Sequence, residues 1–158
     1  MPKETLDLGE WCLEREVAGI ISDAGPVMLA YHINKTCGLK LVRPAQDLQV
    51  ITEDQTHRFV SFCEPREDGS SWWLLSNRSY TKHEKKLAAN TLFEEVYSQV
   101  HFFYQRQNAD YFLWHECENE DHQALSKIHP LLRKVPYLRG LHVFGPREKH
   151  LFNQRLQY

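Results

Sequence analysis

The residues best suited to bind a metal ion are concentrated in residues 115–122, HECENEDH. This segment holds two histidines, one cysteine, three glutamates and one aspartate. A zinc site of the HExxH type needs its two histidines one helical turn apart, so that both rings reach one ion. Here His115 and His122 are seven positions apart, and acidic residues are also favoured in the first turn of a helix. We therefore favour an acidic turn over a metal site, and we expect no metal and no cofactor.

Nucleophilic catalysis would require one of the four cysteines to lie beside one of the nine histidines. The cysteines are widely spaced, and none belongs to a local signature of a catalytic thiol. The sequence also contains no glycine-rich phosphate loop, no GxSxG motif and no paired-carboxylate pattern. We therefore name no catalytic residue, and an enzyme with an unrecognised site is the third of our functional hypotheses.

Aromatic and basic side chains are better candidates for binding. Trp72 and Trp73 lie in a predicted hairpin, and Arg139 and His142 lie in a predicted last strand. A sheet face with exposed aromatic rings and a basic rim is one way to bind single-stranded RNA. The alternative is that one tryptophan faces the core while the other covers the sheet. RNA is therefore the second partner that we consider, after a protein.

The C-terminal segment combines cations with apolar side chains. Its candidate binding residues are Arg147, Lys149, Phe152 and Arg155. Leaving the apolar residues of this segment in water would forgo roughly 1.5 kcal/mol or more each. We therefore expect the segment to pack on the domain itself or on a partner protein. The sequence predicts a single domain over residues 1–145, followed by a basic and aromatic tail over residues 146–158.

A strand and a helix are predicted near the start of the chain. Residues 16–22 form a short apolar run rich in β-branched residues, which is typical of a buried strand. Pro26 suits the first position of a helix, and Gly38 supplies a left-handed stop. Residues 34–36 are polar, and their place in the last turn indicates helix termination rather than a ligand contact. The residues expected on the buried face of this helix are Val27, Ala30, Ile33 and Cys37.

A hairpin is the clearest local pattern in the middle of the chain. Residues 57–64 and 71–79 alternate between apolar and polar residues around a PREDGS turn, which predicts two paired strands. Before them, residues 39–43 are predicted to form a strand that Pro44 ends.

The second half of the chain predicts strands at residues 109–116 and 137–144. Between them, residues 119–135 are predicted to form a helix that is capped by Asn119 and kinked or divided at Pro130. Residues 91–107 fit either a helix or a strand, and we favour a helix that begins with a capping box.

The order of these elements predicts the fold class. Two strand–helix–strand units flank an antiparallel hairpin, in the order β-α-β-β-β-(α)-β-α-β. This order favours one mixed or antiparallel sheet with helices packed on one face. We therefore predict a single domain of the α+β class.

The composition restricts the location and the partners. The chain of 158 residues has a formal net charge of −2, so no strong global field attracts nucleic acid or a membrane. No run of about 18 apolar residues is present, and the first residues lack the pattern of a signal peptide. Without an export signal, the thiols are expected to be reduced. We therefore expect a cytoplasmic protein that does not bind a membrane.

Several short segments resemble a known family. Ile33-Asn34-Lys35 at the end of the first helix, Asn77-Arg78-Ser79 after the hairpin and Asp110-Tyr111 at the start of a strand recur in kind and order in the IPExxVDY family of the Bacteroidetes. The eponymous IPE is absent, because residues 106–109 read RQNA. The chain thus resembles a divergent member, which implies a cytosolic bacterial protein and no particular activity.

The leading functional hypothesis is a non-enzymatic domain that binds a partner protein through the exposed side of its sheet and its basic tail. An RNA-associated module is the alternative. The residues that we expect to contribute to binding in either case are Trp72, Trp73, Arg139, His142, Arg147, Lys149, Phe152 and Arg155.

Overall fold

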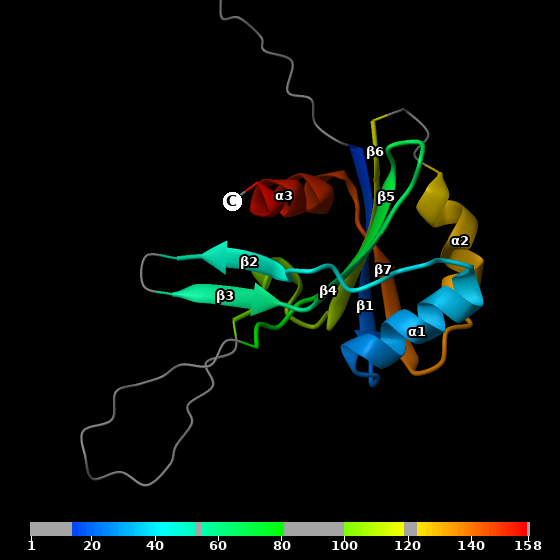
Figure 1. Ribbon diagram of the computed structural model, residues 1–158, viewed down its shortest axis with the longest axis horizontal. Coiled ribbons are helices and arrows are strands. Elements are labelled where there is room, and N and C mark those ends of the chain that lie inside the picture. Colours follow the sequence, from blue (N-terminus) through cyan, green and yellow to red (C-terminus); the bar gives the residue numbers. More distant parts are fainter. Residues whose placement is uncertain (1–13, 53–54, 81–99, 119–122, 158) are drawn as a thin grey trace, which may run out of the picture.

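The computed structural model describes residues 14–52, 55–80, 100–118 and 123–157 (Figure 1). Its centre is a five-stranded sheet in which every neighbouring pair of strands is antiparallel. The predicted α+β class is confirmed, and the sheet is of the antiparallel kind. In spatial order its strands are β4 (Ser61–Pro65), β5 (Ser71–Ser76), β6 (Tyr111–Cys117), β1 (Glu14–Ser22) and β7 (Leu138–Val143).

Both faces of this sheet are covered (Figure 1). The helices α1 (Pro26–Cys37) and α2 (Ala124–Leu132) pack on one face, as the sequence predicts, and form a first hydrophobic core with it. The other face is covered by α3 (Pro146–Leu156) and by a small sheet of β2 (Leu48–Ile51) and β3 (Thr56–Phe59), which form a second core. The segment predicted to be a tail is therefore the third helix. None of the described helices is long and apolar enough to span a membrane.

The central strands are apolar on both sides because both of their faces are buried. In β6, Leu113 belongs to the first core, and its neighbours Phe112 and Trp114 belong to the second. Successive side chains of a strand point to opposite faces of the sheet. The same alternation in β5 places Trp72 in the first core and Trp73 against the second.

The first helix begins and ends as the sequence predicts. Gly25 is its N-cap and Pro26 its first residue, and Gly38 adopts the left-handed conformation with a φ of 71°. The N–H of Gly38 donates to the Asn34 carbonyl at 3.0 Å. The Asn34 side chain also exchanges two hydrogen bonds with the backbone of Leu41, at 2.9 and 2.8 Å. Asn34 therefore has the structural role at the helix end that we expect.

The predicted buried face of α1 is wrong at one position. Ala30 and Ile33 are buried together with Leu29, but Val27 is 64% exposed. Leu29 and Ile33 lie one helical turn apart on the same face, and this face turns Val27 toward solvent.

Residues 39–43 do not form the predicted strand. Leu39 and Leu41 are buried in the first core, and only Val42 makes a β-bridge, to Cys63. Both backbone groups of Leu41 are already bonded to the Asn34 side chain. Leu41 therefore cannot pair with a neighbouring strand.

The hairpin of β4 and β5 is confirmed, but its first predicted strand is divided. Residues 57–64 separate at Val60 into β3, which pairs with β2, and β4, which pairs with β5. Phe59 lies in the second core and Phe62 in the first.

Of the helix predicted over residues 91–107, residues 91–99 lie outside the described residues. Its described end is not an α-helix. His101 forms a bridge with Arg78, and Tyr104–Arg106 forms a short 3-10 helix, η1.

The buried side chain of Asn77 explains the path of this segment. Its amide nitrogen donates to the carbonyls of Arg106 and Ala109 at 3.1 and 2.9 Å, and its oxygen accepts from the Phe103 N–H at 2.9 Å. These three bonds hold the chain in a loop over the sheet, which places Phe102 and Phe103 in the second core. An α-helix through these residues would carry the two neighbouring rings to different sides.

The second helix is shorter than the sequence predicts. Its proposed cap, Asn119, lies outside the described residues, and the helix runs from Ala124 through Pro130 to Leu132 without being divided. A carboxylate oxygen of Glu16 accepts a hydrogen bond from the Leu125 N–H at 2.7 Å. A side chain of β1 therefore satisfies one of the free N–H groups of the first helical turn.

The third helix contributes Phe152 to the second core, where its side chain is fully buried. We expect Phe152→Ala to lower the free energy of unfolding by about 3–5 kcal/mol, because it removes a buried ring and leaves a cavity. The exposed Tyr104 is the control, since Tyr104→Ala should change stability by about 0.5 kcal/mol or less. Urea unfolding followed by circular dichroism measures both. An unchanged midpoint for Phe152→Ala would contradict the packing of α3.

Candidate functional site

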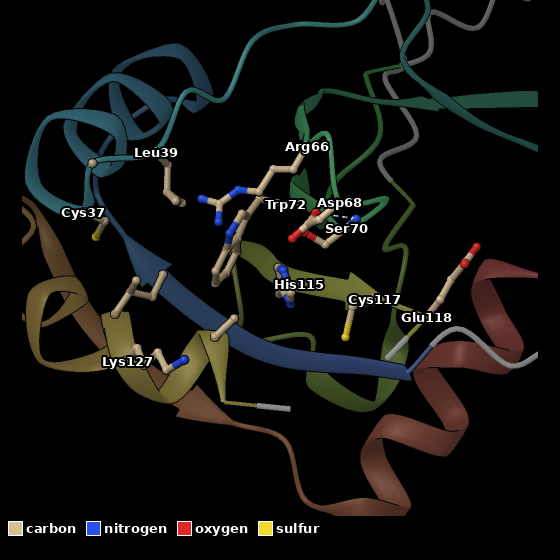
Figure 2. Close-up of a pocket in the computed structure, with 13 residues that line it drawn as sticks. Cys37, Leu39, Arg66, Asp68, Ser70, Trp72, His115, Cys117, Glu118 and Lys127 are labelled. Carbon is tan, nitrogen blue, oxygen red and sulfur yellow. Dashed lines mark hydrogen bonds between the residues drawn. The ribbon is translucent and has the colours of Figure 1, made fainter. Parts of the chain in front are cut away.

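Four segments of the chain meet around one cavity of about 350 Å³, which we call the Trp72 pocket (Figure 2). The end of α1, the turn between β4 and β5, the strands β5 and β6, and the first turns of α2 form its walls. The residues that line it and are used below are Cys37, Leu39, Arg66, Asp68, Ser70, Trp72, His115, Cys117, Glu118, Ala124, Lys127 and Ile128.

Trp72 has the most unusual environment in this pocket. Its side chain is 1% exposed, and its Nε1–H is buried without a hydrogen-bond partner among the described residues. Leaving a buried donor unsatisfied costs about 1–3 kcal/mol. The indole ring itself is well packed, because the ring of His115, directly opposite on β6, lies 4.8 Å away between centroids. Trp72 therefore brings to the pocket wall a buried donor that has no acceptor among the described residues.

Charged side chains lie on the turn beside Trp72. The Arg66 side chain is 41% exposed, and its Nε lies 3.4 Å from a carboxylate oxygen of Glu64. Asp68 accepts hydrogen bonds from the backbone N–H and the hydroxyl of Ser70, at 2.9 and 2.6 Å. These bonds, the hydroxyl's first, lower the pKa of Asp68. The carboxylate of Asp68 is therefore ionised at neutral pH and already bonded on one oxygen.

The thiol of Cys37 is not suited to nucleophilic catalysis. Burial raises the pKa of the Cys37 thiol to about 11, and the thiolate is the reactive form. At neutral pH this group is a neutral, weakly polar part of the pocket wall. Cys37 is therefore not a candidate nucleophile of this pocket.

Only the first part of the HECENEDH segment belongs to a regular element. Residues 115–117 belong to β6, which agrees with the strand predicted over residues 109–116. The acidic residues predicted to form a turn lie mainly in residues 119–122, outside the described residues. His115 and Cys117 line the pocket. Glu116 lies on the opposite face and accepts hydrogen bonds from Arg15 and Trp73 at 2.9 and 3.1 Å. Among the described residues, no group of three or more His, Cys, Asp or Glu is placed to hold a metal ion.

The two tryptophans do not form a common exposed surface. Trp72 is buried in the pocket wall, whereas Trp73 stacks on Trp114 with the centroids 6.0 Å apart. The Nε1–H of Trp73 donates to Ser71 and Glu116 at 3.0 and 3.1 Å. The alternative reading of the pair, with one ring in the core and the other covering the sheet, describes this arrangement.

The other predicted binding residues are not brought together with Trp72. Arg139 forms an exposed ion pair with Asp23 at 3.1 Å. Arg155 lies over the ring of Phe102 and donates to its carbonyl at 3.0 Å. Phe152 is buried, Arg147 is exposed, and Lys149 is partly buried beside a different cavity. Of the cations of α3, Arg155 therefore helps to hold the helix in place.

None of the binding residues predicted from the sequence is Arg66, Asp68 or Lys127. Arg66 and Asp68 lie in the PREDGS turn, which carries a strong turn signal and no binding signal. Lys127 is one exposed residue of a helix. Only the tertiary structure brings these charges to Trp72.

Comparisons with known proteins identify no family. A scan against protein families, a search of curated proteins and a search of solved structures each find no match.

The remaining predicted residue, His142, belongs to a cluster that joins α3 to the sheet. Glu148 accepts hydrogen bonds from Arg106 of η1 at 2.5 Å and from His142 of β7 at 2.9 Å. The hydrogen bond from the Arg106 guanidinium, followed by that from His142, lowers the pKa of Glu148 to about 2. This cluster connects η1, β7 and α3 at the protein surface.

We expect the contribution of Glu148 to stability to depend on pH. Because its pKa is lower in the folded protein than its ordinary value of 4.5, the contribution is complete above about pH 4.5 and is lost as the pH falls toward 2. Glu148→Gln should lower the free energy of unfolding by about 0.2–1 kcal/mol at pH 7. The difference from the wild type should then disappear near pH 2. Urea unfolding at a series of pH values measures it, and a difference that is constant across the series would contradict this role.

Proposed function

We propose that this protein is a non-enzymatic binding domain whose Trp72 pocket takes a small polar molecule. The observation that carries the proposal is the buried Nε1–H of Trp72, which lines a cavity and has no acceptor among the described residues. Ligand pockets combine apolar walls with a few fixed polar groups that orient the ligand. The Trp72 pocket combines apolar residues such as Leu39 and Ile128 with a larger polar and charged part of its lining.

The neutral thiol of Cys37 supports binding over catalysis. The cost of the unsatisfied donor also supports binding, because a ligand acceptor would recover a hydrogen bond that the protein alone does not make. A phenylalanine in place of Trp72 would fill most of the same space in the core without this donor.

The proposal predicts that binding depends on Trp72 and not on its neighbour. Ligand-observed NMR with a set of small acids, amides and alcohols should detect binders in the wild type and in Trp73→Phe, and none of them in Trp72→Phe. In the wild type, the indole N–H resonance of Trp72 should shift on binding, which tests the site without any substitution. If the same molecules bind to Trp72→Phe, or if no molecule shifts this resonance, the pocket is not the binding site.

Binding of a partner protein is the second candidate function. An exposed apolar surface on α1, which packs on the first core, favours it. Val27, Met28 and Tyr31 lie on one face of α1 and are exposed, as is Tyr137 near them; we call these four residues the α1 patch. The ring of His32 connects Tyr31 to Tyr137, with centroid distances of 5.3 and 5.7 Å. Clustered apolar residues in water are typical of protein interaction sites.

Tyr137 also has a strained backbone. Its φ of 65° is unusual for a residue with a side chain. Its carbonyl accepts hydrogen bonds from the Asp23 N–H and the Ser22 hydroxyl, at 3.1 and 3.0 Å. Strain of this kind is retained where the surrounding structure determines it, often at functional sites.

If the α1 patch binds a partner, Tyr31→Ser should weaken capture of that protein by about tenfold or more, because exposed aromatic residues contribute strongly to interfaces. Tyr104→Ser, at an equally exposed tyrosine of η1, should leave capture unchanged. Pull-down of the two variants with quantitative mass spectrometry compares them. Sedimentation of the purified protein shows separately whether the partner is a second copy. Equal capture by both variants would exclude the patch.

The RNA alternative receives less support, because the aromatic pair on which it depends does not share an exposed face. We also propose, on the sequence segments quoted above, that the chain is a divergent member of the IPExxVDY family and acts in the cytoplasm.

A further inference from the structure

The donors of the Trp72 pocket point to the chemistry of its ligand. The first donor is the unsatisfied Nε1–H of Trp72. The second is Arg66, whose guanidinium extends over the pocket toward the indole in Figure 2. Of its nitrogens, Nε faces Glu64, and the two terminal amino groups have no partner among the described residues. The pocket therefore has one buried donor without an acceptor, and beside it a partly exposed guanidinium whose terminal amino groups are not used by its ion pair with Glu64.

An anionic group satisfies both donors at once. A planar guanidinium bonds a carboxylate or a phosphate through two parallel N–H groups, and such charged hydrogen bonds are stronger than neutral ones. The indole N–H can donate to the same oxyanion. A neutral amide or alcohol would satisfy Trp72 alone and leave Arg66 without this gain.

The negative charges near the pocket do not prevent this arrangement. Asp68 is bonded to Ser70 through one oxygen and lies close enough to Arg66 and His115 for its pKa to be lowered by both, after the larger effect of Ser70. Glu118 is exposed, and its carboxylate points away from Trp72 in Figure 2. On the opposite wall, Lys127 adds a positive charge.

The apolar part of the pocket indicates that the anion belongs to an organic molecule. Leu39, Ile128 and Ala124 line the cavity next to the indole ring. An inorganic ion would leave this surface unused. The volume of about 350 Å³ lies at the lower end of the range for ligand pockets, which suits a small molecule.

We infer that the Trp72 pocket takes a small organic acid whose carboxylate is held by the indole N–H of Trp72 and the terminal amino groups of Arg66, with its apolar part against Leu39 and Ile128. This inference rests on the proposed function, that the pocket binds a small molecule, and adds the chemical class of the ligand. Phosphate presents the same oxyanion chemistry, so the experiment has to distinguish the two sources.

The test compares acids with amides of the same shape. Benzoate, phenylacetate and 3-phenylpropionate, each beside its carboxamide, are titrated into the full-length protein while the Trp72 indole N–H resonance is followed. At least one acid should bind about tenfold or more tightly than its amide, because the bond to Arg66 is charged. Arg66→Gln should remove this preference and leave amide binding unchanged. Arg139→Gln, which removes an exposed arginine that pairs with Asp23 elsewhere, should retain it.

Each other result overturns the inference in a recognisable way. If acids and amides bind equally, the pocket binds small molecules without selecting an anion, and only the proposed function survives. A preference that persists in Arg66→Gln removes Arg66 as the partner of the carboxylate. If inorganic phosphate displaces the acid at equal concentration, the site recognises phosphate rather than an organic acid. If none of the acids binds while neutral molecules from the earlier NMR set do, the ligand class is wrong; if nothing binds, the proposed function fails as well.

Discussion

The constraint on which the rest of the structure depends is that the central sheet is apolar on both faces. The strand β6 carries Leu113 on one side and Phe112 and Trp114 on the other, and all three are buried. Burying a side chain of this size stabilises a fold by about 1.5–3 kcal/mol, so neither face can remain in water. The two helices α1 and α2 close the first face. The second face requires α3 and the small sheet, which makes the C-terminal segment part of the domain and uses Arg155 to hold it.

The Trp72 pocket follows from this layered arrangement. It lies at the edge of the first core, where the end of α1, the start of α2 and the β4–β5 turn meet but leave a cavity. Trp72 belongs both to the core and to the pocket wall, and its buried nitrogen has no partner among the described residues. Packing alone explains the ring. Binding gives a reason for the nitrogen.

Two asparagine side chains show how the same protein uses hydrogen bonds when the role of a polar group is structural. The amide of Asn77 makes three hydrogen bonds to the loop that it holds, and the amide of Asn34 makes two to the backbone of Leu41. Both asparagines thereby determine the path of a segment that has no regular secondary structure. Trp72 differs from them, since its donor directs no segment of the described chain. This contrast is the physical basis for treating the pocket as a site.

The sequence by itself determined the elements whose signals are local. Pro26 and Gly38 bound the first helix because proline fits the first helical turn and glycine adopts a positive φ without strain. Alternation around PREDGS located the hairpin, because a strand places successive side chains on opposite faces. The tertiary structure decided what depends on distant partners: Asn34 takes both backbone groups of Leu41 and prevents a strand, and Asn77 holds residues 100–109 in a loop. It also decided the site, because the fold alone brings Arg66 of a turn, Trp72 of β5 and Leu39 after α1 to one cavity. No local pattern records which residues meet when strands and helices pack, and the pocket exists only through that packing.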